Sequence, residues 1–270
     1  MERVRLILPQ SETGNKVDVF IEYFESRLLA GERSSALAKV EKLIVLLHEA
    51  GFAPEQFSFA DDPTEPGSRE VYTADAFRRY FLAPGSVTPV LIRNQQPSYE
   101  LRLGTAGPLL PTSLLSWSIS PAHPQQLEQI LALGSKVASL AEPLFGGAGW
   151  VWDAESDAAS KFNVMMDMRS WELKQNGPDS AAIRTWFGPA FASQLDQTEL
   201  EALGMSVRRT DWGSLEVDLT EAPWKASFEL LAERKASLNT YLSERGLLGD
   251  YSRAVLRTPG RNWRALLTSV

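Results

Sequence analysis

The stretch LFGGAGWVWD, residues 144–153, decides how the middle of the chain folds. A dinucleotide-binding loop needs a strand before its glycines and a helix after them. The order here is the reverse, because a helix-like segment, residues 124–144, precedes the glycines and an extended segment follows them. A P-loop would also need a lysine followed by serine or threonine, and no such pair follows these glycines. The stretch therefore predicts a tight entry into a buried strand and not a phosphate site.

The glycines and tryptophans of this stretch are assigned structural roles. Gly146 or Gly147 is expected to take the left-handed conformation that ends a helix, since glycine has no Cβ to clash there. Gly149 is expected to let two backbone segments pack closely. Trp150 and Trp152 would share one face of a strand and lie in the core. The predicted structural residues, here and in a later stretch, are Gly147, Gly149, Trp150, Trp152, Gly204 and Trp212.

Apolar residues at helical spacing mark five segments around this stretch. Residues 16–32 (KVDVFIEYFESRLLAGE) show such spacing. Residues 34–51 (SSALAKVEKLIVLLHEAG) form the clearest helix of the first half, with serines as its cap and Gly51 as its stop. Further helices are predicted over residues 73–83, 124–144 and 224–246.

Strand patterns complete the predicted architecture. They cover residues 4–8, 98–105, 113–120, 149–153, 170–174 and 206–220, the last as a hairpin that turns near residues 211–214. Helices and strands do not alternate strictly, so the predicted class is α+β, with a largely antiparallel sheet packed with several helices. No linker or repeat divides the chain. We therefore expect a single domain over residues 1–270, or two lobes at 1–120 and 121–270.

The charge and the composition exclude several classes of function. Lys and Arg number 27 against 34 Asp and Glu, which gives a net charge of -7. Nucleic acids and anionic membranes normally require a basic face, so neither is the expected partner, whereas the charge permits a basic protein as a partner. The absence of cysteine and the presence of only two histidines argue against a metal site, and no cofactor is expected. No apolar run approaches the roughly 20 residues that span a bilayer, and the N-terminus does not resemble a signal peptide, so the expected location is cytoplasmic.

Two local patterns suggest metal chemistry at first sight. Asp153, Glu155 and Asp157 alternate as in a calcium loop, but the positions that require glycine and glutamate hold Ala158 and Val164, so an EF-hand is rejected. A solvated turn or a binding surface remains for these carboxylates.

The second pattern is Glu172-x-Lys174, an arrangement that restriction-type nucleases use with an earlier aspartate to hold a divalent ion. Asp153, Asp157 or Asp167 could supply that aspartate. A metal-dependent nuclease is therefore kept as the alternative function. His48, inside a helix, and His123, at a helix start, are not accompanied by a nucleophile motif and are interpreted as surface or turn residues.

The layout of residues 124–222 resembles a known family. Gly147–Gly149 followed by Trp150, and Gly204 followed by Asp211-Trp212, match the glycine-aromatic motifs of bacterial immunity proteins encoded beside polymorphic and type VI secretion toxins. Residues 50–63 (AGFAPEQFSFADDP) resemble the subgroup paired with restriction-endonuclease-fold toxins. The resemblance implies a non-enzymatic inhibitor that binds one cognate toxin.

Clustered carboxylates are the candidate partner-binding residues. A nuclease toxin has a cationic cleft, and carboxylates could occupy it in place of phosphates and speed association. The candidates are Asp61, Asp62 and Glu65, then Asp153, Glu155 and Asp157, and finally Glu216 and Asp218 beside Glu221. An ordinary hydrated surface is the alternative role of each cluster. If the charges have no role, an aromatic surface with Trp212 or Trp224 is the next candidate.

Overall fold

The computed structural model describes residues 17–24, 26–29, 32–59, 67–83, 89–104, 114–122, 124–152, 176–250 and 262. The strands are β1 (Val17–Phe24), β2 (Gln56–Ser58), β3 (Arg69–Val71), β4 (Val90–Arg93), β5 (Ser98–Gly104), β6 (Leu114–Ala122), β7 (Phe145–Trp152), β8 (Arg184–Phe187), β9 (Ser206–Arg209) and β10 (Leu215–Asp218). The helices are α1 (Arg33–Glu49), α2 (Ala74–Leu82), α3 (Pro124–Ala141), α6 (Pro189–Ala192), α7 (Gln197–Ala202) and α8 (Phe228–Glu244), with short 3-10 turns η1 (Arg27–Leu29) and η2 (Pro223–Lys225).

In the described part of the chain, ten strands form one sheet in the order β3-β2-β4-β5-β6-β1-β7-β8-β10-β9. Every neighbouring pair is antiparallel. The predicted α+β class with a largely antiparallel sheet is therefore confirmed. The two predicted lobes meet at residue 120. Strand β1 comes before this position and β7 after it, and the two strands are joined by hydrogen bonds.

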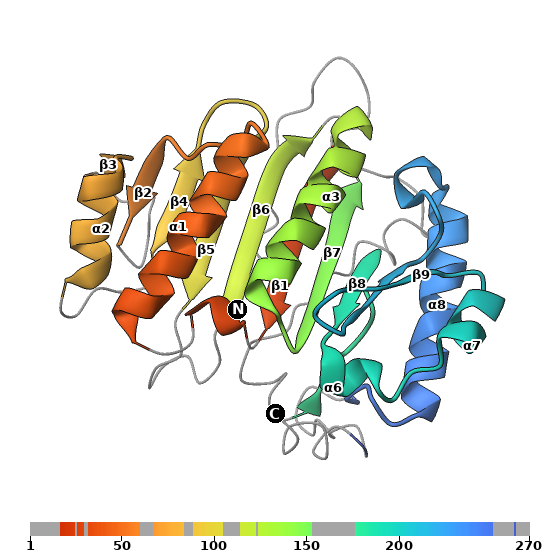
Figure 1. Cartoon of the computed structure of the whole chain (residues 1–270). Coiled ribbons are helices and arrows are strands. Elements are labelled where there is room, and N and C mark those ends of the chain that lie inside the picture. The colour runs from red at the N-terminus through yellow and green to blue at the C-terminus, as the bar shows by residue number, and fades with distance from the viewer. Residues whose placement is uncertain are drawn as a thin grey trace.

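Helices α1, α2 and α3 lie across one face of the sheet, and α7 and α8 lie at its β9 end (Figure 1). The core is formed where α1 and α3 cover the central strands. Val19, Ile21 and Tyr23 of β1 are fully buried there, and Leu115 and Trp117 of the neighbouring strand β6 are buried with them. This arrangement accounts for the apolar spacing of both helices, because each needs one apolar stripe to face the sheet.

Residues 17–24 form a central strand, so the helix predicted for this segment is wrong. The side chains of Val19, Ile21 and Tyr23 are buried on one face, whereas Asp18 and Glu22 on the other face are only half-buried. This alternation has a period of two, which is the period of a strand. β-Branched and aromatic residues also fit a pleated surface between two partner strands.

Most of the other predicted elements are present. Helices α1, α2, α3 and α8 match predicted segments, and Gly51 and Gly246 follow α1 and α8 in the left-handed conformation, with φ of 80° and 66°. Glu32, and not a serine, precedes α1, and it makes no side-chain cap. Strands β5 and β6 and the β9–β10 hairpin were predicted, whereas β2, β3, β4 and β8 were not. The predicted strands at residues 4–8 and 170–174 lie outside the described residues.

The glycine-rich stretch lies inside β7 and does not cap the preceding helix. Gly147 sits within the strand, and the left-handed residue after α3 is Glu142, with φ of 41°. A Cβ on Gly149 would meet nothing within 4 Å, so the predicted close approach at this glycine is wrong. The close approach occurs at Gly146, where a Cβ would lie 3.0 Å from the Glu22 carbonyl oxygen and 3.3 Å from Trp186 Cε3.

Valine substitutions at these two glycines are expected to have different effects. Gly146→Val should lower the free energy of unfolding by about 1–3 kcal/mol, because the backbone at Glu22 cannot move aside without disturbing β1. Gly149→Val should leave it nearly unchanged, since the position is open and extended. Urea titration of both variants measures the difference. If both variants lose the same free energy of unfolding, the close contacts at Gly146 are not the reason why this position requires glycine.

Candidate functional site

The register of the sheet lines up polar side chains on the face that α3 covers. One row of directly paired residues crosses β1, β7, β8, β10 and β9 and consists of Tyr23, Gly146, Trp186, Glu216 and Arg208. The next row consists of Ile21, Ala148, Arg184, Asp218 and Ser206. Directly paired residues point to the same face of a sheet, so the two rows bring four charged groups together. We call these charged residues and the tryptophan the polar ledge: Arg184, Trp186, Arg208, Glu216 and Asp218.

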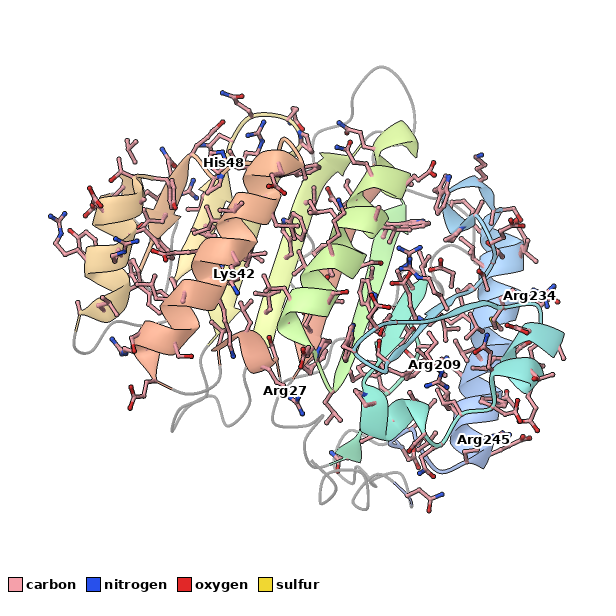
Figure 2. All side chains as sticks on the ribbon, in the orientation of Figure 1. Arg27, Lys42, His48, Arg209, Arg234 and Arg245 are labelled. Atoms are coloured by element: carbon pink, nitrogen blue, oxygen red, sulfur yellow. The ribbon has the colours of Figure 1, made fainter. Side chains whose placement is uncertain are left out.

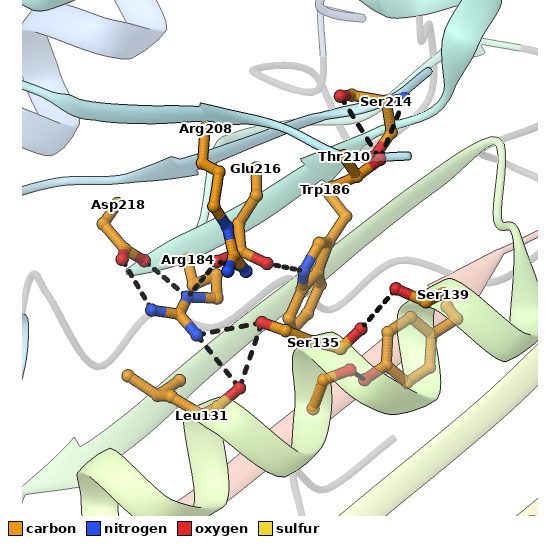
Figure 3. Close-up of polar contacts among 12 residues, drawn as sticks. Leu131, Ser135, Ser139, Arg184, Trp186, Arg208, Thr210, Ser214, Glu216 and Asp218 are labelled. Carbon is orange, nitrogen blue, oxygen red and sulfur yellow. Dashed lines mark hydrogen bonds and ion pairs between the residues drawn. The ribbon is translucent and has the colours of Figure 1, made fainter. Parts of the chain in front are cut away.

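Arg184 is the centre of the polar ledge (Figure 3). Its Nε and Nη2 atoms donate to the two carboxylate oxygens of Asp218, each at 2.6 Å. Its Nη1 atom donates to the Leu131 carbonyl oxygen and to Ser135 Oγ of α3, each at 3.0 Å. The guanidinium therefore ties β8 and β10 to α3 through a planar fork whose geometry suits a carboxylate.

Glu216 is the second buried carboxylate of the polar ledge. Its Oε2 atom accepts from Trp186 Nε1 at 2.9 Å, and its Oε1 atom accepts from Arg208 Nη2 at 2.7 Å and lies 3.5 Å from Arg184 Nε. Burial alone would raise the pKa of Glu216. The charge of Arg184, the hydrogen bonds from Ser135 and Trp186, and the charge of Arg208 together hold that pKa below its ordinary value.

The chemistry of the polar ledge is that of a neutral, hydrogen-bonded network. Two arginines balance two carboxylates, and each carboxylate accepts hydrogen bonds from a cation. Tyr23, at the end of the same row, donates to the Gly134 carbonyl oxygen at 2.6 Å, and burial raises its pKa well above the ordinary value. A general base needs a free lone pair beside its substrate. In the ledge, both carboxylates already accept hydrogen bonds from arginine side chains, and these bonds join β8, β9 and β10. Burial raises the pKa of Asp218 although the hydrogen bond and the charge of Arg184 act in the opposite direction.

The assignment of Glu216 and Asp218 to an exposed acidic surface is wrong. Both residues are buried, with exposed fractions of 4% and 7%, and both are paired with arginines. All four residues of β10 are buried, so the charged side chains on one face and the apolar side chains on the other are both shielded from water. Glu221 is exposed. The other two acidic clusters lie outside the described residues, namely Asp61, Asp62 and Glu65, and Asp153, Glu155 and Asp157.

The alternative catalytic candidates are placed as follows. Glu172, Lys174 and His123 lie outside the described residues. His48 is exposed on α1, as the sequence predicts (Figure 2). Across the described ranges, no group of three or more His, Cys, Asp or Glu residues could hold a metal ion. No helix in the described part of the chain is long and apolar enough to cross a membrane.

The predicted structural residues, and Trp224 from the alternative aromatic surface, differ in their burial and in the elements to which they belong. Trp150 is buried, with 1% of its surface exposed, and Gly204 follows α7 with φ of +82°. Trp212 lies half-buried in the turn between β9 and β10, and Trp224 lies half-buried in η2. The indole N–H groups of both are buried, and no described residue accepts a hydrogen bond from either. Trp152 belongs to β7.

Sequence reasoning missed the partners of the two buried carboxylates. Arg184 and Trp186 belong to β8, which was not predicted. Ser135 belongs to α3, which was predicted from its apolar residues, so its polar side chains were not considered. One signal was present. Glu216 and Asp218 alternate with Leu215, Val217 and Leu219, which indicates a strand buried on one face, so an acidic residue on the other face needs either water or a cation.

Comparison with solved structures shows a similar fold, whereas the sequence comparisons find no match. No protein-family model matches the sequence, and no curated protein matches it. The fold is similar to that of "Pseudomonas aeruginosa T6SS protein PA0821", with a TM-score of 0.53 and 12% sequence identity. The match covers 96% of this chain and 83% of that chain. At this identity the likeness establishes a shared fold.

Proposed function

We propose that this chain is an immunity protein that binds and neutralises a cognate antibacterial toxin of a type VI secretion system. The toxin is a basic nuclease, and inhibition is stoichiometric, takes place in the cytoplasm and needs no cofactor. The observation that carries the proposal is the fold likeness to a protein described as a T6SS protein, which spans 96% of this chain.

Two further observations support this proposal. The glycine-aromatic motifs around Trp150 and Trp212 are similar to those of immunity proteins, and the net charge of -7 suits a basic partner. In the polar ledge, Glu216 and Asp218 are engaged by arginines, an arrangement that favours a binding protein over an acid-base catalyst.

A co-expression experiment tests the proposal. The product of an adjacent gene is taken as the candidate toxin and is expressed in bacteria with and without this chain, and cell survival and the dissociation constant of the purified pair are measured. We expect protection and a one-to-one complex. The purified chain is also incubated with DNA and magnesium. DNA cleavage that is abolished by Glu172→Ala or Lys174→Ala would instead establish the nuclease alternative.

Neutralising the acidic cluster at residues 153–157 is expected to slow association with the toxin. The variant Asp153→Asn, Glu155→Gln, Asp157→Asn keeps the side-chain shapes and removes three negative charges. Steering acts over roughly a Debye length of 8–10 Å, so the loss of association rate should be largest at low ionic strength. Stopped-flow mixing at several salt concentrations measures it.

The matched variant replaces Asp61, Asp62 and Glu65 by Asn, Asn and Gln. Comparing the association rates of the two variants shows which cluster contributes more to binding. If both variants associate at the wild-type rate and still protect cells, inhibition does not depend on these charges. The aromatic surface at Trp212 or Trp224 would then be the better candidate.

A further inference from the structure

Arg208 combines an exposed side chain with a buried carboxylate partner. Its side chain is 63% exposed, whereas that of Glu216, to which its Nη2 atom donates at 2.7 Å, is 5% exposed. Glu216 is in turn fixed by Trp186 Nε1 at 2.9 Å (Figure 3). An exposed arginine is therefore bonded to a buried carboxylate whose other oxygen accepts a hydrogen bond from Trp186.

We propose that Arg208 is a pre-oriented anchor that binds a carboxylate of the toxin, and that the β9 end of the sheet belongs to the toxin-binding surface. This inference rests on the proposed immunity function. It assigns to that function a residue and a partner chemistry that the acidic clusters do not provide.

The energetic argument concerns the cost of ordering a long side chain. A free arginine loses rotamer entropy when a partner immobilises it, and this loss reduces affinity. At Arg208 the ion pair with Glu216 restricts the side chain before the partner arrives. A guanidinium has five N–H donors, and the bond to Glu216 uses one nitrogen, so the fork can still pair with a second carboxylate. Arginines of this kind are enriched among the residues that dominate binding energy.

The charge balance favours a protein carboxylate over nucleic acid as the occupant. The polar ledge is neutral, and the whole chain carries a net charge of -7, so the field around Arg208 does not attract a polyanion. A single carboxylate on a basic protein meets no such barrier. β9 is also the last strand in the sheet order, which places Arg208 at the end of the sheet.

The neighbouring residue Arg209 provides a matched control. It is exposed, carries the same charge and belongs to the same strand. Because side chains alternate along a strand, it points to the face opposite to that of Arg208. A loss of charge alone would affect both variants equally. A specific contact would affect only Arg208.

The test measures the dissociation constants of Arg208→Gln and Arg209→Gln for the purified candidate toxin that the wild-type chain binds in the co-expression experiment. We expect the dissociation constant to rise about 30-fold or more for Arg208→Gln, which is the effect expected of a residue that dominates an interface. For Arg209→Gln it should rise less than about threefold. Arg208→Lys should also weaken binding, because an ammonium cannot form the two parallel bonds. Arg208→Gln removes a cation beside the buried Glu216 and should lower the melting temperature, so its binding is measured well below that temperature. Arg208→Lys keeps a cation there, and Arg209 is exposed, so Arg208→Lys and Arg209→Gln should melt near the wild-type temperature.

Each outcome decides a different question. Equal dissociation constants for the two glutamine variants would overturn the anchor and leave the immunity function intact. No binding by the wild-type chain would overturn both. If Arg208→Lys weakens binding and also melts at a lower temperature than the wild type, Arg208 stabilises β9 and is not an anchor.

Discussion

Arg184→Leu is expected to lower the free energy of unfolding by about 3–5 kcal/mol, because it leaves the buried carboxylate of Asp218 without its cation. The loss also removes the hydrogen bonds to the Leu131 carbonyl oxygen and Ser135 Oγ, so α3 loses its polar attachment to β8. Urea titration followed by fluorescence measures the change.

A double variant separates the lost cation from the lost packing. Arg184→Leu with Asp218→Leu removes both charges, and replacing a buried ion pair by apolar residues is often neutral. We therefore expect the double variant to regain most of the stability that the single variant loses. If the single variant loses less than about 1 kcal/mol, water reaches Asp218 and the ledge is not a buried network.

Trp150→Ala is expected to lower the free energy of unfolding by a similar amount, about 3–5 kcal/mol. The side chain is 1% exposed within β7, so its removal leaves a cavity that the neighbouring strands cannot fill. Calorimetry measures the decrease in melting temperature. The fraction that remains folded should bind the toxin with unchanged affinity.

Trp212→Ala is the matched control for this prediction, because Trp212 is only half-buried and lies in a turn. It should cost less stability than Trp150→Ala. Wild-type stability of Trp150→Ala together with a loss of toxin binding would place the glycine-aromatic stretch at the interface and not in the core.

The elements that the sequence predicts well are those specified by local signals. Helix α1 ends where Gly51 takes a positive φ, and α8 ends before Gly246 for the same reason. The hairpin of β9 and β10 turns at residues 210–214, where Thr210 Oγ1 and Ser214 Oγ lie 2.7 Å apart. Such features depend on a few neighbouring residues, so a single sequence is sufficient to find them.

The candidate site was predicted only in part. The sequence draws attention to Glu216 and Asp218 as charged residues, but places them on the surface. Their partners Arg184 and Trp186 come from β8, whose sequence RTWF does not alternate between polar and apolar residues and therefore gives no strand signal. Arg208 was not selected, because an arginine in a polar stretch has no distinctive local signal.

The sequence by itself determined the α+β class, the helices over the sheet and the buried character of the glycine-aromatic strand. Only the tertiary structure decided that residues 17–24 form the central strand, because that choice depends on hydrogen bonds to β6 and β7, which come from distant parts of the chain. It also decided that Gly146, and not Gly149, needs to be glycine, since the neighbours are Glu22 and Trp186. The burial of Glu216 and Asp218 has the same origin. A carboxylate is buried only where cations from other strands compensate the loss of water, and sequence spacing does not reveal which strands those are.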